Sequence, residues 1–154
     1  MRADLRGFRD SLAGVRQQRQ WRLDEGAAKA AGLQSQLILA ERACEESSKR
    51  LAEASARASA DWHKRLDPAT QSGLLAHLAD LQAQGLGLAA EAQQLRDALA
   101  ETRRIVAQRQ QDLEVLDRYR KDLLVDYELA QARTCAAAAD ADWLSRTAAG
   151  RGKS

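Results

Sequence analysis

Apolar residues recur at alternating steps of four and three along the C-terminal half of the chain. Of the 21 positions in this series, 16 are Leu, Val, Ala or Tyr. This spacing is the seven-residue repeat of a coiled coil, in which one stripe of the helix keeps facing a partner helix. It predicts a long helix over about residues 74–147. The positions are Leu74, Leu78, Leu81, Gly85, Leu88, Ala92, Leu95, Leu99, Thr102, Val106, Arg109, Leu113, Leu116, Arg120, Leu123, Tyr127, Ala130, Thr134, Ala137, Ala141 and Leu144.

A second series of the same kind occupies the N-terminal half and predicts a helix over about residues 3–66. It begins with Leu5, Phe8, Leu12 and Val15, and resumes as Leu23, Gly26, Ala30, Leu33, Leu37, Ala40, Cys44, Ser47, Leu51, Ala54 and Ala58. Between the two parts the pattern is blurred by arginines. Joining them through Arg19 requires a four-residue insertion in the repeat, which is a stutter that locally unwinds a coiled coil.

The dipeptide Asp67-Pro68 is the strongest break in the sequence. Asp is a good helix N-cap, and Pro is tolerated at the first helical position. We expect a turn at about 67–73, with the alternative that the second helix already begins at Pro68 as a short separate turn. Two long helices joined by a short connection must lie antiparallel. The predicted fold is therefore all-α: one domain, residues 1–147, forming an antiparallel coiled-coil hairpin, followed by a disordered basic tail at 148–154.

A turn centred near residue 70 pairs residues whose numbers sum to about 140. This rule places Leu51 near Leu88, and Trp62 near Leu78 at the hairpin end. It leaves residues beyond about 139 without a partner on the first helix, so that the second helix overhangs the N-terminus.

Composition agrees with a narrow seam and not with a globular core. Charged residues make up 30% of the chain and aromatic residues 4%, and there is a single proline. The two cysteines, Cys44 and Cys135, do not suggest a disulfide framework. No signal peptide is expected, and no apolar run is long enough to enter a bilayer directly. We expect a cytoplasmic protein.

The usual residues of catalysis and metal binding do not come together in the sequence. His63 and His77 flank the predicted turn, but no Cys or suitably placed carboxylate completes a ligand set. Asp140 and Asp142 have no His or Lys beside them, and Gly85-x-Gly87 alone is not a phosphate-binding loop. We therefore expect no enzymatic activity, no metal and no cofactor.

Charge is unevenly distributed, although the net charge is only +2. Residues 1–23 carry six Arg against two Asp, for +4, whereas residues 67–100 carry one Arg against four acids, for −3. The N-terminal arginines face an acidic segment of the second helix in the predicted hairpin. Salt bridges or a protein partner suit this pattern better than nucleic acid does. We expect no nucleic-acid binding.

Two ends of the hairpin are candidate partner-binding surfaces. Arg109 and Arg120 occupy seam positions, where a charge must be paired or reach solvent. Two explanations remain open: Arg120 pairs with an acid at the seam edge, or this end is gripped by another protein. Trp and Arg are typical of binding hot spots. The candidates at the terminal end are Arg16, Arg19, Trp21, Arg22, Arg133, Trp143, Leu144 and Arg146, and those at the hairpin end are Trp62, His63, Leu75 and His77.

The chain resembles the stalk proteins of type III secretion systems, the FliJ/YscO-like family. The stretch 12–22 (LAGVRQQRQWR) is similar to that family's apolar residues followed by a charged, Arg/Glu-rich helix. The stretch 113–127 (LEVLDRYRKDLLVDY) resembles its Leu-rich, Lys/Arg-rich run that ends in tyrosine. The family often continues with acids and lysines, whereas residues 135–142 (CAAAADAD) keep the acids alone.

This resemblance implies a non-enzymatic central stalk, similar to the gamma subunit of rotary ATP synthases. The terminal end would sit in the hexameric secretion ATPase, and the hairpin end would reach toward the export-gate protein at the inner membrane. Some members of the family also bind secretion chaperones. A monomer is expected. The alternative is a generic coiled-coil scaffold or dimerisation protein that associates through the same seam.

Overall fold

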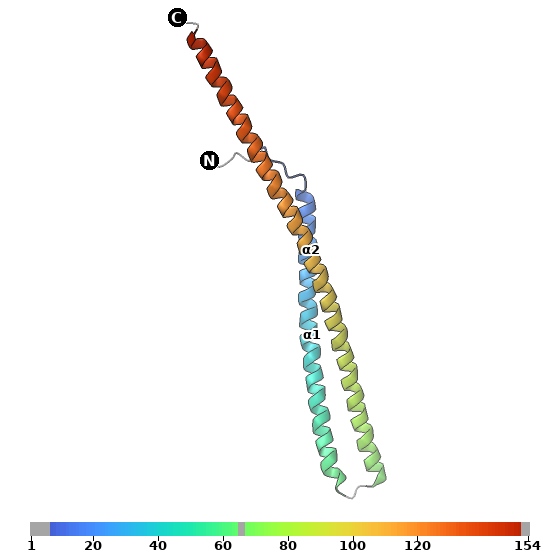
Figure 1. Ribbon diagram of the computed structural model, residues 1–154. Coiled ribbons are helices and arrows are strands. Elements are labelled where there is room, and N and C mark those ends of the chain that lie inside the picture. Colours follow the sequence, from blue (N-terminus) through green and yellow to red (C-terminus); the bar gives the residue numbers. More distant parts are fainter. Residues whose placement is uncertain (1–6, 65–66, 152–154) are drawn as a thin grey trace. The chain divides into compact units, whose positions relative to one another are not determined.

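The computed structural model describes residues 7–64 and 67–151 and contains two long helices packed against each other. These are α1 (Ala13–Trp62) and α2 (Pro68–Arg151) (Figure 1). No strand occurs in the described ranges. The predicted all-α helical hairpin is confirmed. The chain divides into two compact units, however, where the sequence predicted one. We call residues 23–108 the hairpin unit, and residues 7–22 with 109–151 the terminal unit.

In the hairpin unit, the predicted seam is the packed stripe. From Leu23 to Ala58 all eleven seam positions of α1 are buried or half-buried. From Leu74 to Val106 the same holds for all ten seam positions of α2, and every other α2 residue in that stretch is exposed. The centre of the packing is Leu37, Ala92 (1% exposed) and Leu99 (4% exposed).

The connection between the helices is shorter than predicted. α1 ends at Trp62, with Lys64 N–H donating to the Asp61 carbonyl (2.9 Å), and α2 begins at Pro68. The predicted start of the second helix at residue 74 is therefore wrong, and the alternative start at Pro68 leads directly into a continuous helix. Residues 65–66, which belong to the predicted first helix, lie outside the described residues.

Asp67 caps α2, as its sequence position suggested. Its carboxylate Oδ1 accepts a hydrogen bond from the Thr70 amide (3.0 Å), and its carbonyl accepts one from the Gln71 amide (3.1 Å). The hydrogen bonds from Thr70 stabilise the ionised carboxylate and so lower the pKa of Asp67 below its ordinary value. Pro68 has no N–H to leave unsatisfied, so it suits the first position of the helix that Asp67 caps.

The shorter turn shifts the pairing of the helices by about one heptad. Leu51 lies with Leu78, Ala79 and Gln82, one repeat nearer the turn than the predicted partner Leu88. Gly85 faces Ser47: a Cβ at Gly85 would lie 3.3 Å from the Ser47 Oγ, so glycine allows this close approach. The predicted pairing of Leu51 with Leu88 is thus wrong.

The boundaries of the terminal unit also differ from the prediction. α1 begins at Ala13 and not near residue 3, so Phe8 and Leu12 precede the helix; Leu5 lies outside the described residues. α2 continues to Arg151, so residues 148–151 are helical where a disordered tail was predicted, and residues 152–154 lie outside the described range.

Candidate partner-binding surfaces

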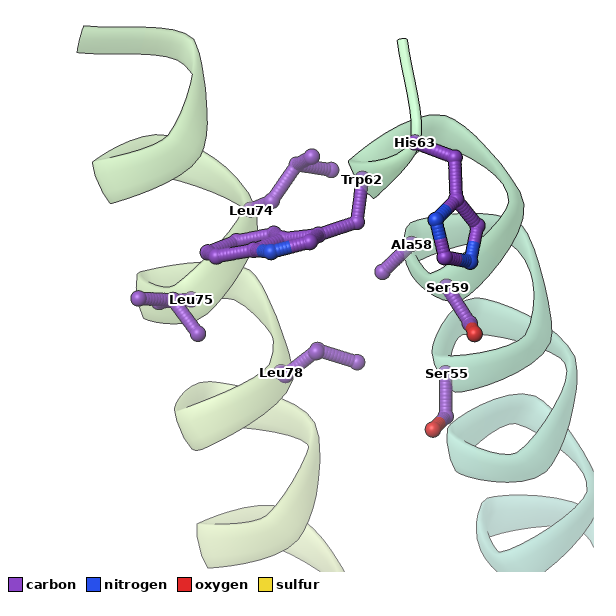
Figure 2. Close-up of a pocket in the computed structure, with 8 residues that line it drawn as sticks. All are labelled: Ser55, Ala58, Ser59, Trp62, His63, Leu74, Leu75 and Leu78. Atoms are coloured by element: carbon purple, nitrogen blue, oxygen red, sulfur yellow. The ribbon is translucent and has the colours of Figure 1, made fainter. Parts of the chain in front are cut away.

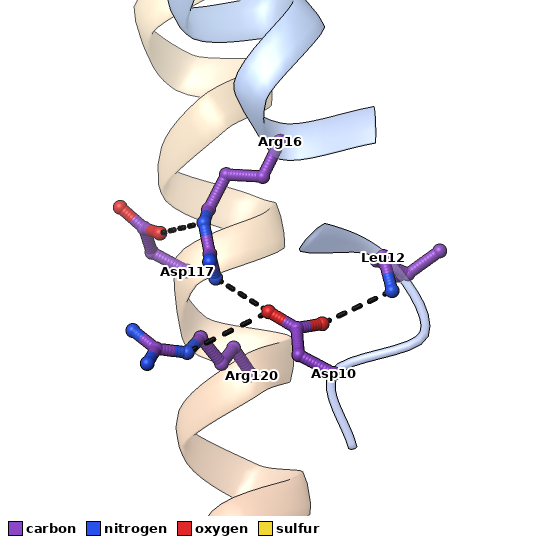
Figure 3. A network of polar contacts seen from close by, with 5 residues as sticks. All are labelled: Asp10, Leu12, Arg16, Asp117 and Arg120. Atoms are coloured by element: carbon purple, nitrogen blue, oxygen red, sulfur yellow. Dashed lines mark hydrogen bonds and ion pairs between the residues drawn. The ribbon is translucent and has the colours of Figure 1, made fainter. Parts of the chain in front are cut away.

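A carboxylate that the sequence analysis did not single out organises the start of α1. Asp10 accepts hydrogen bonds from the Leu12 amide (3.0 Å) and from Nη1 of Arg16 (2.8 Å), and Nε of Arg120 lies 3.6 Å from its Oδ2 (Figure 3). Its side chain is only 12% exposed. The bond to Leu12 forms a local turn that competes with helix, which explains why α1 starts only at Ala13. The only sequence signal for this role of Asp10 was its place two residues before the apolar Leu12.

An aromatic contact fixes the chain before Asp10. Phe8 packs edge-on against Tyr127 of α2, with the ring centroids 5.6 Å apart. At Gly7 a Cβ would lie 2.7 Å from the Tyr127 hydroxyl, so a larger residue at this position would have to push the end of that side chain aside. The non-helical segment 7–12 therefore contacts α2 through Phe8 and Asp10.

Both arginines at seam positions have partners inside the terminal unit. Arg120 pairs with Asp10, and Arg109 donates from Nη1 to the Arg22 carbonyl (2.7 Å). These contacts agree with the explanation in which the seam charges are satisfied within the chain.

The predicted terminal-end residues divide into two groups. Arg16, 25% exposed, contacts Asp10 and lies 4.0 Å from Asp117, and Arg19 contacts Asp112 (3.4 Å). Both therefore have intramolecular ion pairs. Trp21 and Arg22 are exposed on α1. Arg133, Trp143, Leu144 and Arg146 are exposed on α2, where Arg146 pairs with Asp142 one turn earlier.

The C-terminal part of α2 is exposed over a longer stretch than predicted. Every residue from Glu128 to Arg151 is exposed, whereas the sequence analysis placed the overhang beyond about residue 139. We call residues 128–151 the α2 extension. The extension begins directly after Tyr127, the residue against which Phe8 packs. Its large apolar side chains include Leu129, Trp143 (65% exposed) and Leu144.

The hairpin end has an apolar groove between the helices. Trp62 of α1 projects across to Leu74, Leu75 and Leu78 of α2, with Ala58 beneath it (Figure 2). The predicted proximity of Trp62 and Leu78 is confirmed. The groove has a volume of about 370 Å³, and Trp62 and Leu75 remain partly exposed at its rim.

The two histidines do not form a shared site. His63 lines the edge of the groove, whereas His77 is exposed on α2 and is not among the groove residues. Within residues 7–64 and 67–151 there is no cluster of His, Cys, Asp and Glu that could hold a metal ion. The described helices also contain no stretch that is long and apolar enough to cross a membrane.

Comparison with known proteins found no matching family model, no matching curated protein and no matching solved structure.

Proposed function

We propose that the protein is a non-enzymatic helical stalk that inserts the α2 extension into a protein partner. The observation that carries this proposal is the helix 128–151, which is exposed along its whole length and displays Trp143 and Leu144. Exposed large apolar side chains next to arginines are typical of surfaces that other proteins bind. Arg133 and Arg146 supply such arginines on the same helix.

The family resemblance specifies the partner in this proposal. It makes the protein a stalk of a type III secretion system, with the extension in the secretion ATPase hexamer and the hairpin end directed to the export-gate protein. Secretion chaperones are further candidate partners at that end. The protein would then be cytoplasmic and peripheral to the inner membrane through the secretion apparatus. Support at the hairpin end is the groove at Trp62 and Leu75, which suits an apolar side chain of a partner.

The structure changes which residues we assign to the ATPase contact. Because Arg16 and Arg19 pair with acids inside the chain, reversing their charge would disturb the terminal unit itself. Contacts from α1 are therefore assigned to Trp21 and Arg22. Contacts from α2 are assigned to Arg133, Trp143, Leu144 and Arg146.

The test is a pull-down and an ATP hydrolysis assay with the cognate secretion ATPase hexamer. We expect the double variant Trp143→Ala/Leu144→Ala, and a chain truncated after Glu128, to lose binding and any stimulation of hydrolysis. The matched control is Leu39→Ala/Leu86→Ala, which removes two exposed leucines of the hairpin unit. Circular dichroism checks that each variant stays helical. Full binding by the folded, truncated chain would refute insertion of the extension.

The second candidate function is a coiled-coil scaffold that associates with itself. It is favoured by the continuation of the seven-residue repeat into the extension, where Ala130, Ala137 and Leu144 are exposed.

A further inference from the structure

The seam continues on the α2 extension beyond the point where the chain covers it. Ala130, Thr134, Ala137, Ala141 and Leu144 keep the steps of four and three, and all five are exposed. With Tyr127 at position a of the heptad, Thr134 and Ala141 are also a positions, and Ala130, Ala137 and Leu144 are d positions. This face has coiled-coil spacing and small side chains at its centre.

We propose that the α2 extensions of two copies of this chain pair with each other as an antiparallel coiled coil. In such a pair, each a residue meets a d residue of the other copy. Ala130 then faces the second copy's Ala141, and Thr134 faces the second copy's Ala137. Small side chains in these central layers let the two helices approach closely.

The charges beside the seam favour a second copy of the chain as the partner, and they favour an antiparallel orientation. Arg133 and Asp140 are both g positions, immediately beside the seam. In the antiparallel pair, Arg133 lies opposite the second copy's Asp140, and the two-fold symmetry makes this ion pair twice. A parallel pair would instead place these two residues beside Ala138 and Ser145 and form neither ion pair.

One large apolar residue of the extension fits the same register. Leu144 is a d position and lies opposite the second copy's Tyr127. Leu129 and Trp143 are c positions on the outer face of the coiled coil, so both stay exposed in the pair. Leu144 reaches the edge of the second copy's Phe8–Tyr127 contact.

The overlap, about residues 127–144, is short and its central side chains are small, so we expect a weak and reversible dimer. This replaces the expected monomer with an equilibrium that depends on concentration. The pairing deepens the second candidate function, self-association, and does not rest on the stalk proposal. It would cover Leu144 and the rest of the seam, so a partner that binds this face of the extension would have to displace the second copy.

Sedimentation equilibrium of the full chain over a wide concentration range tests the proposal. The background is Cys135→Ser in reducing buffer, because Cys135 is exposed and could oxidise between copies. We expect wild-type protein to dimerise. With Arg133→Glu, the new acid at position 133 of each copy lies opposite Asp140 of the other, and with Asp140→Arg two arginines lie opposite each other at both places. Each variant alone should therefore dimerise roughly tenfold more weakly than wild type.

The most discriminating measurement is the mixture of the two single variants. In their heterodimer, one copy has acids at both positions 133 and 140 and the other has arginines at both, so both ion pairs form again. The mixture should therefore dimerise as strongly as wild type, as should the double variant Arg133→Glu/Asp140→Arg. The matched control is Arg118→Glu, the same charge change at an exposed position of α2 outside the extension, which should leave dimerisation unchanged.

Two results would overturn the proposal. One is a wild-type chain that stays monomeric up to about 1 mM, well above the concentration at which a weak specific contact forms. The other is a dimer whose strength is the same in both single variants and in wild type, which would place the contact elsewhere. ATPase binding is not part of this measurement, so its failure and the failure of the stalk proposal are separate outcomes.

Discussion

A disulfide between Ser47→Cys and Gly85→Cys would test the helix register of the hairpin unit. A Cβ at Gly85 lies 3.3 Å from the Ser47 Oγ, the atom that the cysteine sulfur replaces. An S–S bond is about 2.04 Å long, so a second sulfur on residue 85 comes within bonding reach after a small rotation. We expect the oxidised double variant to form this bond within one chain.

The expected stabilisation follows from the length of the loop that the bond closes. About 38 residues separate positions 47 and 85. In the chain-entropy model a loop of this size gives about 4 kcal/mol, from which any strain in the bond is subtracted. At a urea slope of about 2 kcal/mol/M, the midpoint should rise by up to roughly 2 M on oxidation and return on reduction.

The assay combines non-reducing electrophoresis with urea unfolding, with and without reductant. The background carries Cys44→Ser and Cys135→Ser, because Cys44 is a seam residue of α1 one turn from residue 47. The matched control is Leu51→Cys/Leu88→Cys, the pair expected from a sum of 140. One heptad of misalignment is about 10.5 Å along the helix, too far for a disulfide. Cross-linking of the control pair but not of 47 and 85 would refute the observed register.

Two further predictions concern the stability of the hairpin unit. Leu99→Ala, at a 4%-exposed seam position, should lower the free energy of unfolding by roughly 2–5 kcal/mol, whereas Leu86→Ala, 66% exposed, should change it by about 0.5 kcal/mol or less in the same urea titration. Equal losses would mean that the 4-3 stripe is not the packed one. The Asp67 cap should add a pH dependence, because its pKa is lowered in the folded state: its contribution is present above the ordinary pKa of 3.8 and is lost as the pH falls through the lowered value. Asp67→Asn should therefore lose less stability than wild type between about pH 5 and pH 2 in thermal melts, and identical pH profiles would contradict the role of the ionised cap.

In the hairpin unit, the sequence was sufficient to identify which residues pack, whereas in the terminal unit the predicted seam residue Val15 is 42% exposed. The 4-3 spacing marks one face of a helix, and residues on one face are buried together whatever their exact partner. This is why the seam from Leu23 to Ala58, and from Leu74 to Val106, agrees with the observed burial position by position. The exposure of Trp143 and Leu144 follows from the same argument, because the second helix was predicted to be longer than the first.

The register was decided only by the tertiary structure. Sliding one helix by seven residues restores the same seam, so a heptad pattern is equally consistent with Leu51 beside Leu88 and with Leu51 beside Gln82. The turn selects between them, because α2 starts at Pro68 and leaves few residues for the connection.

The composition of the terminal surface was likewise decided in three dimensions. Arg16 and Arg19 look like available cations in the sequence, but Asp10 and Asp112 lie beside them in the fold. The hydrogen bond from the Leu12 amide to Asp10 also makes α1 begin only at Ala13, so Phe8 precedes the helix. Since ion pairs between distant residues and the local turn of one Asp leave no periodic signal, only the folded chain shows that α2 becomes exposed directly after Tyr127.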